Sequence, residues 1–65
     1  MSKLMIIYVD NRRKKVSRRV LRKIMDELGI NPEEYLVVRN GELLTGDRRI
    51  REGDKLKLLP IVSGG

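Results

Sequence analysis

The sequence contains no cysteine, histidine, phenylalanine or tryptophan, and its only aromatic residues are two tyrosines. Without cysteine the chain can form no disulfide and no thiolate-bound zinc or iron–sulfur centre. Without histidine it lacks the usual general base and the commonest metal ligand. A domain of 65 residues also has too small a core to enclose a deep active site. These absences argue against a metal centre and against an enzyme that acts alone.

Long apolar segments are missing as well. No run approaches the roughly 20 residues of a membrane span, and the first ten residues lack the cleavage site of a secretory signal. We therefore expect a cytoplasmic protein with no membrane partner. Charged residues make up 37% of the sequence, against about 25% in a typical domain. The abundance of lysine, arginine and glutamate favours a thermophilic source.

The net charge of +6 is unevenly distributed, with nine bases and one acid in residues 1–23 and six bases and eight acids after them. Eight of the bases form a group that we call the basic cluster: Arg12, Arg13, Lys14, Lys15, Arg18, Arg19, Arg22 and Lys23. Such a cluster is typical of an RNA-binding surface, or of a solvated face that can also dock an acidic protein. Nucleic acid is the less favoured partner, because two tyrosines offer little stacking surface for bases.

One amphipathic helix is predicted over residues 18–28. Five apolar residues recur there at three- and four-residue spacing: Val20, Leu21, Ile24, Met25 and Leu28. This spacing places them on one face of a helix. Ser17 is expected to cap the N-terminus, with Val16 and Leu21 as a hydrophobic staple. Gly29 is expected to end the helix in a left-handed conformation.

Five short strands flank this helix, predicted at residues 4–9, 13–16, 35–39, 42–44 and 55–58. Turn signals at residues 10–11 and at Asn40-Gly41 close two hairpins. The last strand alternates so that Leu56 and Leu58 face inward, and Pro60 marks its end or an edge position. Ile50 anchors the connection before it. The order ββαβββ predicts an α+β fold in which a mixed sheet packs on one helix and the first and last strands are neighbours.

Four features occur together and in order: the Asn40-Gly41 turn, Gly53-Asp54 before an alternating strand, Pro60, and the terminal Gly64-Gly65. In this combination the chain resembles the ThiS/MoaD-type sulfur carriers, a family of ubiquitin-like small modifier proteins. The resemblance implies the ubiquitin-like β-grasp fold. It divides the chain into a single domain at residues 1–60 and a flexible C-terminal tail at residues 61–65.

The resemblance also implies a function, that of a sulfur carrier which is not itself an enzyme. In such carriers a ThiF/MoeB-like adenylating enzyme uses ATP to activate the carboxylate of the last glycine, and sulfur then replaces AMP to give a thiocarboxylate. A sulfur-acceptor enzyme of thiamine biosynthesis, molybdenum cofactor biosynthesis or tRNA thiolation receives the sulfur. By this resemblance Gly65 provides the reacting carboxylate and Gly64 the slender approach to it. The carrier binds no cofactor itself and is expected to be a monomer when free.

Two alternatives use the same fold. A protein modifier joined through Gly65 to lysines of other proteins shares every feature of the carrier. A small basic β-grasp module could instead bind RNA or protein without any chemistry at the tail.

A flexible tail pays an ordering cost on binding, so a docking surface elsewhere on the domain is expected to add affinity. If Leu56 and Leu58 face the helix, Leu59 points to the open face of the sheet. An apolar patch there would mark a protein-binding surface. The residues expected to contact a partner protein are Ile6, Tyr8, Leu59 and Ile61.

Overall fold

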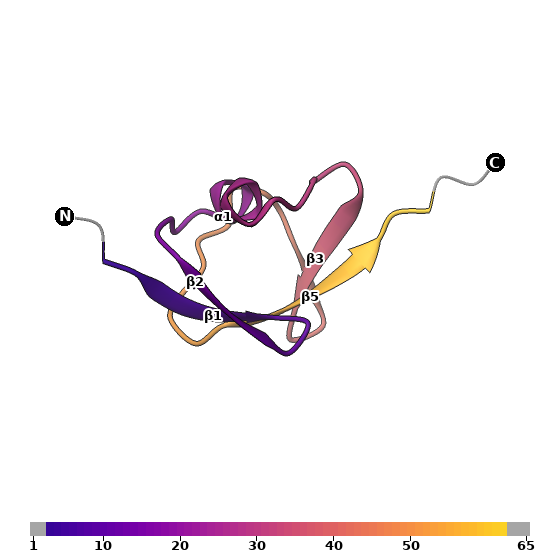
Figure 1. The fold of residues 1–65 in the computed structure, drawn as a ribbon. Helices are drawn as coiled ribbons and strands as arrows, with labels where there is room; N and C mark the ends of the chain where they lie inside the picture. Colours follow the sequence, from indigo (N-terminus) through magenta and orange to yellow (C-terminus); the bar gives the residue numbers. More distant parts are fainter. Residues whose placement is uncertain (1–2, 63–65) are drawn as a thin grey trace.

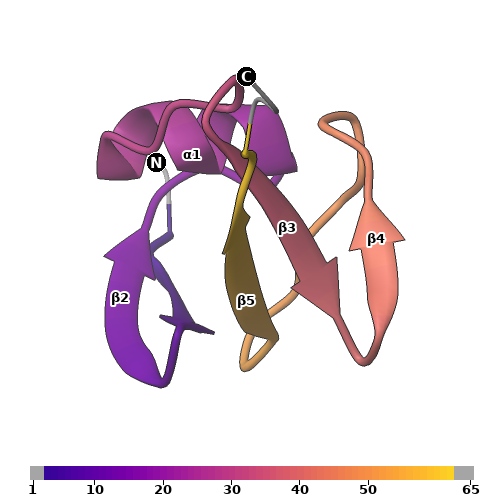
Figure 2. The same cartoon turned by 90° about the vertical axis from the view of Figure 1, so that its right-hand side faces the viewer.

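The structure, a computed structural model, describes residues 3–62. Its elements are β1 (Met5–Val9), β2 (Arg12–Val16), α1 (Leu21–Leu28), β3 (Tyr35–Arg39), β4 (Glu42–Leu44) and β5 (Lys55–Pro60). The strands form one sheet in the order β2-β1-β5-β3-β4, and α1 lies across one face of it (Figures 1 and 2). β1 pairs with β5 in parallel, and the other neighbours are antiparallel. The predicted β-grasp fold, with its first and last strands side by side, is confirmed.

Both hairpins close through two-residue turns with positive φ at each central residue. The values are 51° and 65° at Asp10 and Asn11, and 53° and 78° at Asn40 and Gly41. This backbone is that of a type I′ turn, whose twist matches the twist of the flanking strands. The turn residues therefore set the register of both hairpins, as the sequence predicts.

The core lies between the sheet and α1. Eleven apolar residues are buried there: Met5, Ile7, Val9, Val16, Leu21, Ile24, Met25, Val37, Leu44, Ile50 and Leu56. Alternate residues of β1 and three residues of the predicted helix stripe belong to this set. Ile50 is 1% exposed and anchors the long connection to β5. The outer members of the stripe, Val20 and Leu28, are only half-buried.

The start of the helix differs from the prediction. α1 begins at Leu21, and Ser17 is not its cap; the N-cap position is Val20, whose side chain makes no capping hydrogen bond. The N–H groups of Leu21 and Arg22 instead donate to backbone carbonyls within residues 46–48, each at 2.9 Å. Backbone contacts from a distant segment thus satisfy the first turn, and no local pattern reveals them.

Ser17 has a different role, also at the helix. Its N–H and its hydroxyl donate to the Glu27 carboxylate at 3.0 and 2.9 Å. The predicted staple is wrong for the same reason, because Val16 no longer adjoins the cap; its side chain joins the core instead. The predicted end of the helix is confirmed, with Gly29 in the left-handed conformation at φ 74°.

Candidate functional site

β5 occupies the middle of the sheet and leads the chain toward its C-terminal end (Figure 2). β1, the strand that pairs with β5 in parallel, is the shorter of the two and ends at Val9. Asp10 continues the pairing: its N–H donates to the Leu56 carbonyl at 2.9 Å, and its carboxylate accepts the Leu58 N–H at 3.0 Å. Asp10 therefore helps to hold the strand that precedes the tail, a role that its turn position in the sequence did not indicate.

The chain leaves the sheet just after β5. β3 pairs with β5 as far as Tyr35 opposite Pro60, so the strand ends at Pro60, as predicted. The next residue, Ile61, donates its N–H to the Glu34 carbonyl at 2.8 Å. Val62 follows and is 83% exposed. This point of departure from the domain is the root of the tail.

The predicted reactive residues, Gly64 and Gly65, lie outside the described residues.

Exposed apolar side chains surround the root of the tail. Leu36 of β3 lies opposite Leu59 of β5 in the antiparallel register. These two leucines and Ile61 are 41%, 39% and 43% exposed. We call Leu36, Leu59 and Ile61 the tail-root patch. Leu36 was not among the predicted docking residues, because its position beside Leu59 depends on the register between β3 and β5.

The other two predicted docking residues lie on the same face, farther along the sheet. Ile6 and Tyr8 alternate with buried residues of β1, so they face away from α1. Tyr8 lies beside Lys55 in the parallel register. Lys55 precedes Leu59 by four residues of β5, or about 13 Å of strand. The four predicted docking residues thus form two groups, with Lys57 between them.

Positive charge accompanies the apolar residues of the open face. By strand alternation, four basic side chains face away from the helix: Arg13, Lys15, Lys55 and Lys57. No acid occupies any outward-facing position of the five described strands. This face therefore combines apolar groups with positive charge alone.

The predicted basic cluster does not form one surface. Its first four residues lie along β2, an edge strand, and alternate between the two faces of the sheet. Arg18 and Arg19 lie in the connection after β2, and Arg22 and Lys23 lie on α1. No sequence pattern indicated that the connection would lie beside residues 46–51, which contribute three further arginines.

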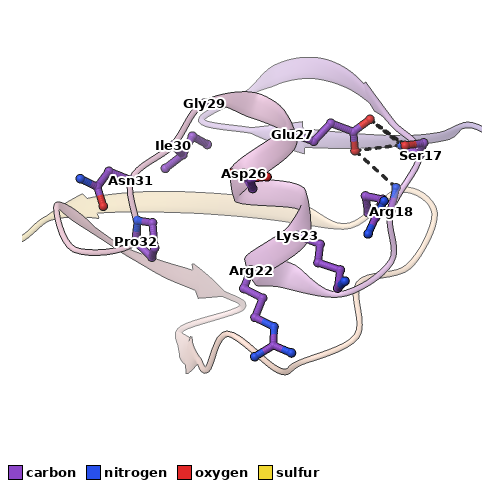
Figure 3. Close-up of a pocket in the computed structure, with 10 residues that line it drawn as sticks. All are labelled: Ser17, Arg18, Arg22, Lys23, Asp26, Glu27, Gly29, Ile30, Asn31 and Pro32. Carbon is purple, nitrogen blue, oxygen red and sulfur yellow. Dashed lines mark hydrogen bonds between the residues drawn. The ribbon is translucent and has the colours of Figure 1, made fainter.

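A hollow of about 900 Å³ lies along the outer side of α1, and its lining carries charges of both signs. In Figure 3 the Glu27 carboxylate points to Ser17 and Arg18, whereas Arg22 and Lys23 extend away from the helix. Desolvation raises the pKa of Glu27, but hydrogen bonds from Ser17 and Arg18 outweigh it and lower that pKa below its ordinary value. Glu27 thus holds the β2–α1 connection and is poorly suited to act as a base.

Residues 3–62 contain no cluster of carboxylates able to hold a metal ion. No helix in this range is long and apolar enough to cross a membrane.

The sheet order, the single helix and the exposed root define a ubiquitin-like β-grasp protein. Residues 6–65 match the model of the ThiS family, and the chain belongs to that family. The sulfur carrier protein TtuB of Thermus thermophilus is 49% identical over 47 residues, which cover 72% of each chain. The solution structure of a computationally designed protein based on human erythrocytic ubiquitin matches with a TM-score of 0.55. It is 19% identical, covers 100% of this chain and 98% of its own, and supports the fold alone.

The family settles the class of activity. The chain is a sulfur carrier protein and not an enzyme, as predicted. Carriers of the ThiS family are activated by a separate adenylating enzyme.

Proposed function

We propose that Gly65 carries the sulfur as a thiocarboxylate, after a ThiF/MoeB-like enzyme has adenylated its carboxylate with ATP. A carboxylate is a poor electrophile, and joining it to AMP supplies a good leaving group. The terminal sulfur of a persulfide then bonds to the carbonyl carbon as AMP leaves. A thiol reduces the resulting disulfide link and releases the thiocarboxylate.

The position of the root is the observation that carries this proposal. The central strand delivers the chain to an exposed point, and the last backbone hydrogen bond of the described residues there is donated by Ile61. Gly65 follows four residues later, so its carboxylate reaches at most about 14 Å from that point. Glycine at positions 64 and 65 adds no side chain that would block a narrow channel. We therefore place the domain at residues 1–60 and the reactive tail at residues 61–65.

The tail-root patch is the docking surface that we propose for the adenylating enzyme. Its exposed leucines adjoin the tail, so binding there would bring the carboxylate to the adenylation site. The lysines and arginines of the open face have no acidic residues beside them on the outward-facing strand positions. This favours a partner surface with an apolar centre and an acidic border. Ile6 and Tyr8 would extend the contact toward the start of β5.

The sulfur acceptor is a separate enzyme. Its pathway can be thiamine biosynthesis, molybdenum cofactor biosynthesis or tRNA thiolation, and the relative TtuB is named only as a sulfur carrier. Conjugation of Gly65 to lysines of other proteins is compatible with the same tail. Intact-mass measurement of the protein from its native cells distinguishes sulfur carriage from conjugation to other proteins. A carrier gains the mass difference between sulfur and oxygen, whereas a modifier appears joined to larger proteins.

The direct test removes Gly65. The shortened chain should remain folded, because the deleted residue lies beyond the last strand, and it should not be adenylated. Deletion moves the carboxylate by up to ~3.6 Å, which positioned chemistry does not tolerate. Gly64→Val is the companion variant, since it keeps the length and adds a β-branched side chain. Adenylation of the shortened chain at the full-length rate in a pyrophosphate-exchange assay would refute the proposal.

A further inference from the structure

The fold gathers basic side chains at the start of β1, from segments that are far apart in the sequence. The Ile50 N–H donates to the Arg19 carbonyl at 2.7 Å, and Val20 forms a bridge with Arg49. A hollow of about 420 Å³ opens beside this contact. We call it the arginine hollow; its basic residues are Lys3, Arg19, Arg49 and Arg51.

The positive charge of the arginine hollow is only partly balanced, since its lining has four bases and one acid. Glu52 is the one acid in its lining, and both of its oxygens already accept the Ile6 N–H, at 3.2 and 3.3 Å. Neither of the two ion pairs in residues 3–62 includes a basic residue of the hollow. Like charges that share a concave site repel one another, and an anion placed among them relieves this repulsion.

The head group of Arg19 is already oriented. Its guanidinium donates to the Lys3 carbonyl at 2.9 Å and to the Arg18 carbonyl at 3.4 Å. Within residues 3–62 the remaining N–H groups of this guanidinium have no other hydrogen-bond partner, and they can donate to a ligand. A guanidinium presents its donors in a planar fork that matches phosphate oxygens. An oriented fork also loses less conformational entropy when the ligand binds.

We propose that the arginine hollow binds phosphate groups of an RNA backbone. The lining has one exposed large apolar side chain, Leu4, which is little for the apolar centre of a protein interface. It has no aromatic residue on which a base could stack. Binding should therefore depend on phosphates and show little preference for base sequence. The scarcity of tyrosines, which made RNA the less favoured partner from the sequence, limits base recognition and not phosphate contacts.

The arginine hollow and the tail root lie at opposite ends of the domain. β1 and β5 run in parallel from the end that carries the hollow, and β5 leaves the sheet at the other end (Figure 1). RNA bound in the hollow thus leaves the tail-root patch uncovered. The inference does not rest on the proposed chemistry of Gly65, and adenylation assays and RNA-binding assays can fail independently.

The test is fluorescence anisotropy of the full chain with a labelled single-stranded RNA. Each neutralised phosphate contributes about 0.7 to the slope of log affinity against log salt. Three arginine contacts therefore contribute a slope of about 2, or a roughly 20-fold loss of affinity between about 50 and 200 mM salt. The triple variant Arg19→Gln, Arg49→Gln and Arg51→Gln should lose this part of the slope and bind RNA correspondingly more weakly.

A matched variant separates the site from the net charge. Replacing Arg12, Arg13 and Lys14 by glutamine removes the same charge toward the hairpin end of β2, where these residues pair with Val9, Tyr8 and Ile7, and should weaken binding much less. Equal losses in the two triple variants, or no RNA binding at physiological salt, would overturn the proposal. Circular dichroism verifies that both variants are folded.

Two further ligands identify the source of the anion. ATP supplied at the same phosphate concentration should compete poorly with RNA, because one ATP molecule contacts fewer basic side chains than an RNA strand does. An acidic peptide such as polyglutamate should bind more weakly than RNA. If ATP displaces RNA at equal phosphate concentration, the hollow is a nucleotide site, and if polyglutamate binds as well through the same arginines, it is a protein-docking site. Either result refutes the RNA proposal.

Discussion

Removing the two leucines of the tail-root patch tests the docking surface in energetic terms. Full burial of a leucine side chain stabilises a complex by about 1.5–3 kcal/mol. Leu36 and Leu59 retain 41% and 39% of their surface for a partner. Each can therefore contribute about 0.6–1.2 kcal/mol to docking. Replacing both with alanine should raise KM for the adenylating enzyme roughly 5- to 50-fold.

The effect should appear in KM and not in kcat, because the patch contacts the partner both before and during the reaction. The two leucines are also more than half buried in the free protein, so the double variant loses about 1–2 kcal/mol of folding stability per residue. The assay, pyrophosphate exchange at increasing carrier concentration, should therefore be run well below the melting temperature.

Leu43→Ala is the matched control for this double variant. Leu43 is 56% exposed and lies on β4, the edge strand farthest from β1. It is more accessible than either leucine of the patch, yet it does not adjoin the tail. An increase in KM as large for Leu43→Ala, or an unchanged KM for the double variant, would show that the partner does not dock at the tail root.

Two other predictions concern stability. Ile24→Ala should cost about 2–5 kcal/mol in urea unfolding, because Ile24 is 1% exposed, whereas Lys23→Ala on the outer face should cost under about 0.5 kcal/mol. A much smaller loss of unfolding free energy for Ile24→Ala would contradict the expectation and would mean that neighbouring side chains repack into the space left by the isoleucine. The lowered pKa of Glu27 gives stability that is present above its ordinary value of 4.5 and lost as the pH falls through the lower folded value. Glu27→Gln should flatten this part of the acid-unfolding profile, and an unchanged profile would contradict the role of Glu27 in holding the β2–α1 connection.

The parts of the fold that the sequence predicted well depend on contacts between near neighbours. Asn40-Gly41 specifies a type I′ turn because both residues tolerate positive φ, and the structure has them in that conformation. Gly29 ends the helix for a similar local reason. Alternation in β5 is also local, and it correctly placed Leu56 in the core.

The parts that the sequence missed depend on contacts between distant segments. The capping residue was wrong because carbonyls of residues 46–48 compete with the Ser17 side chain for the first turn of α1, and Glu27 binds Ser17 instead. The separation of the docking residues into two groups follows from the β1–β5 register, in which Tyr8 lies beside Lys55 and not beside Leu59. Register of this kind requires the paired strands to be known, and a single sequence does not supply it.

The parallel pairing at the centre of the sheet explains how so small a domain can separate the two proposed binding surfaces. Because β1 and β5 point in the same direction, residues 3–4, which precede β1, lie at the same end as the connection that precedes β5, and the outgoing chain lies at the other end. β5 has six residues, which span about 20 Å. A partner enzyme that covers the tail-root patch is therefore a full strand length from the arginines that precede β5. The arginines at that far end lie outside the tail-root patch, so their effect on a partner docked at that patch alone would be long-range attraction, which salt screens within about 10 Å.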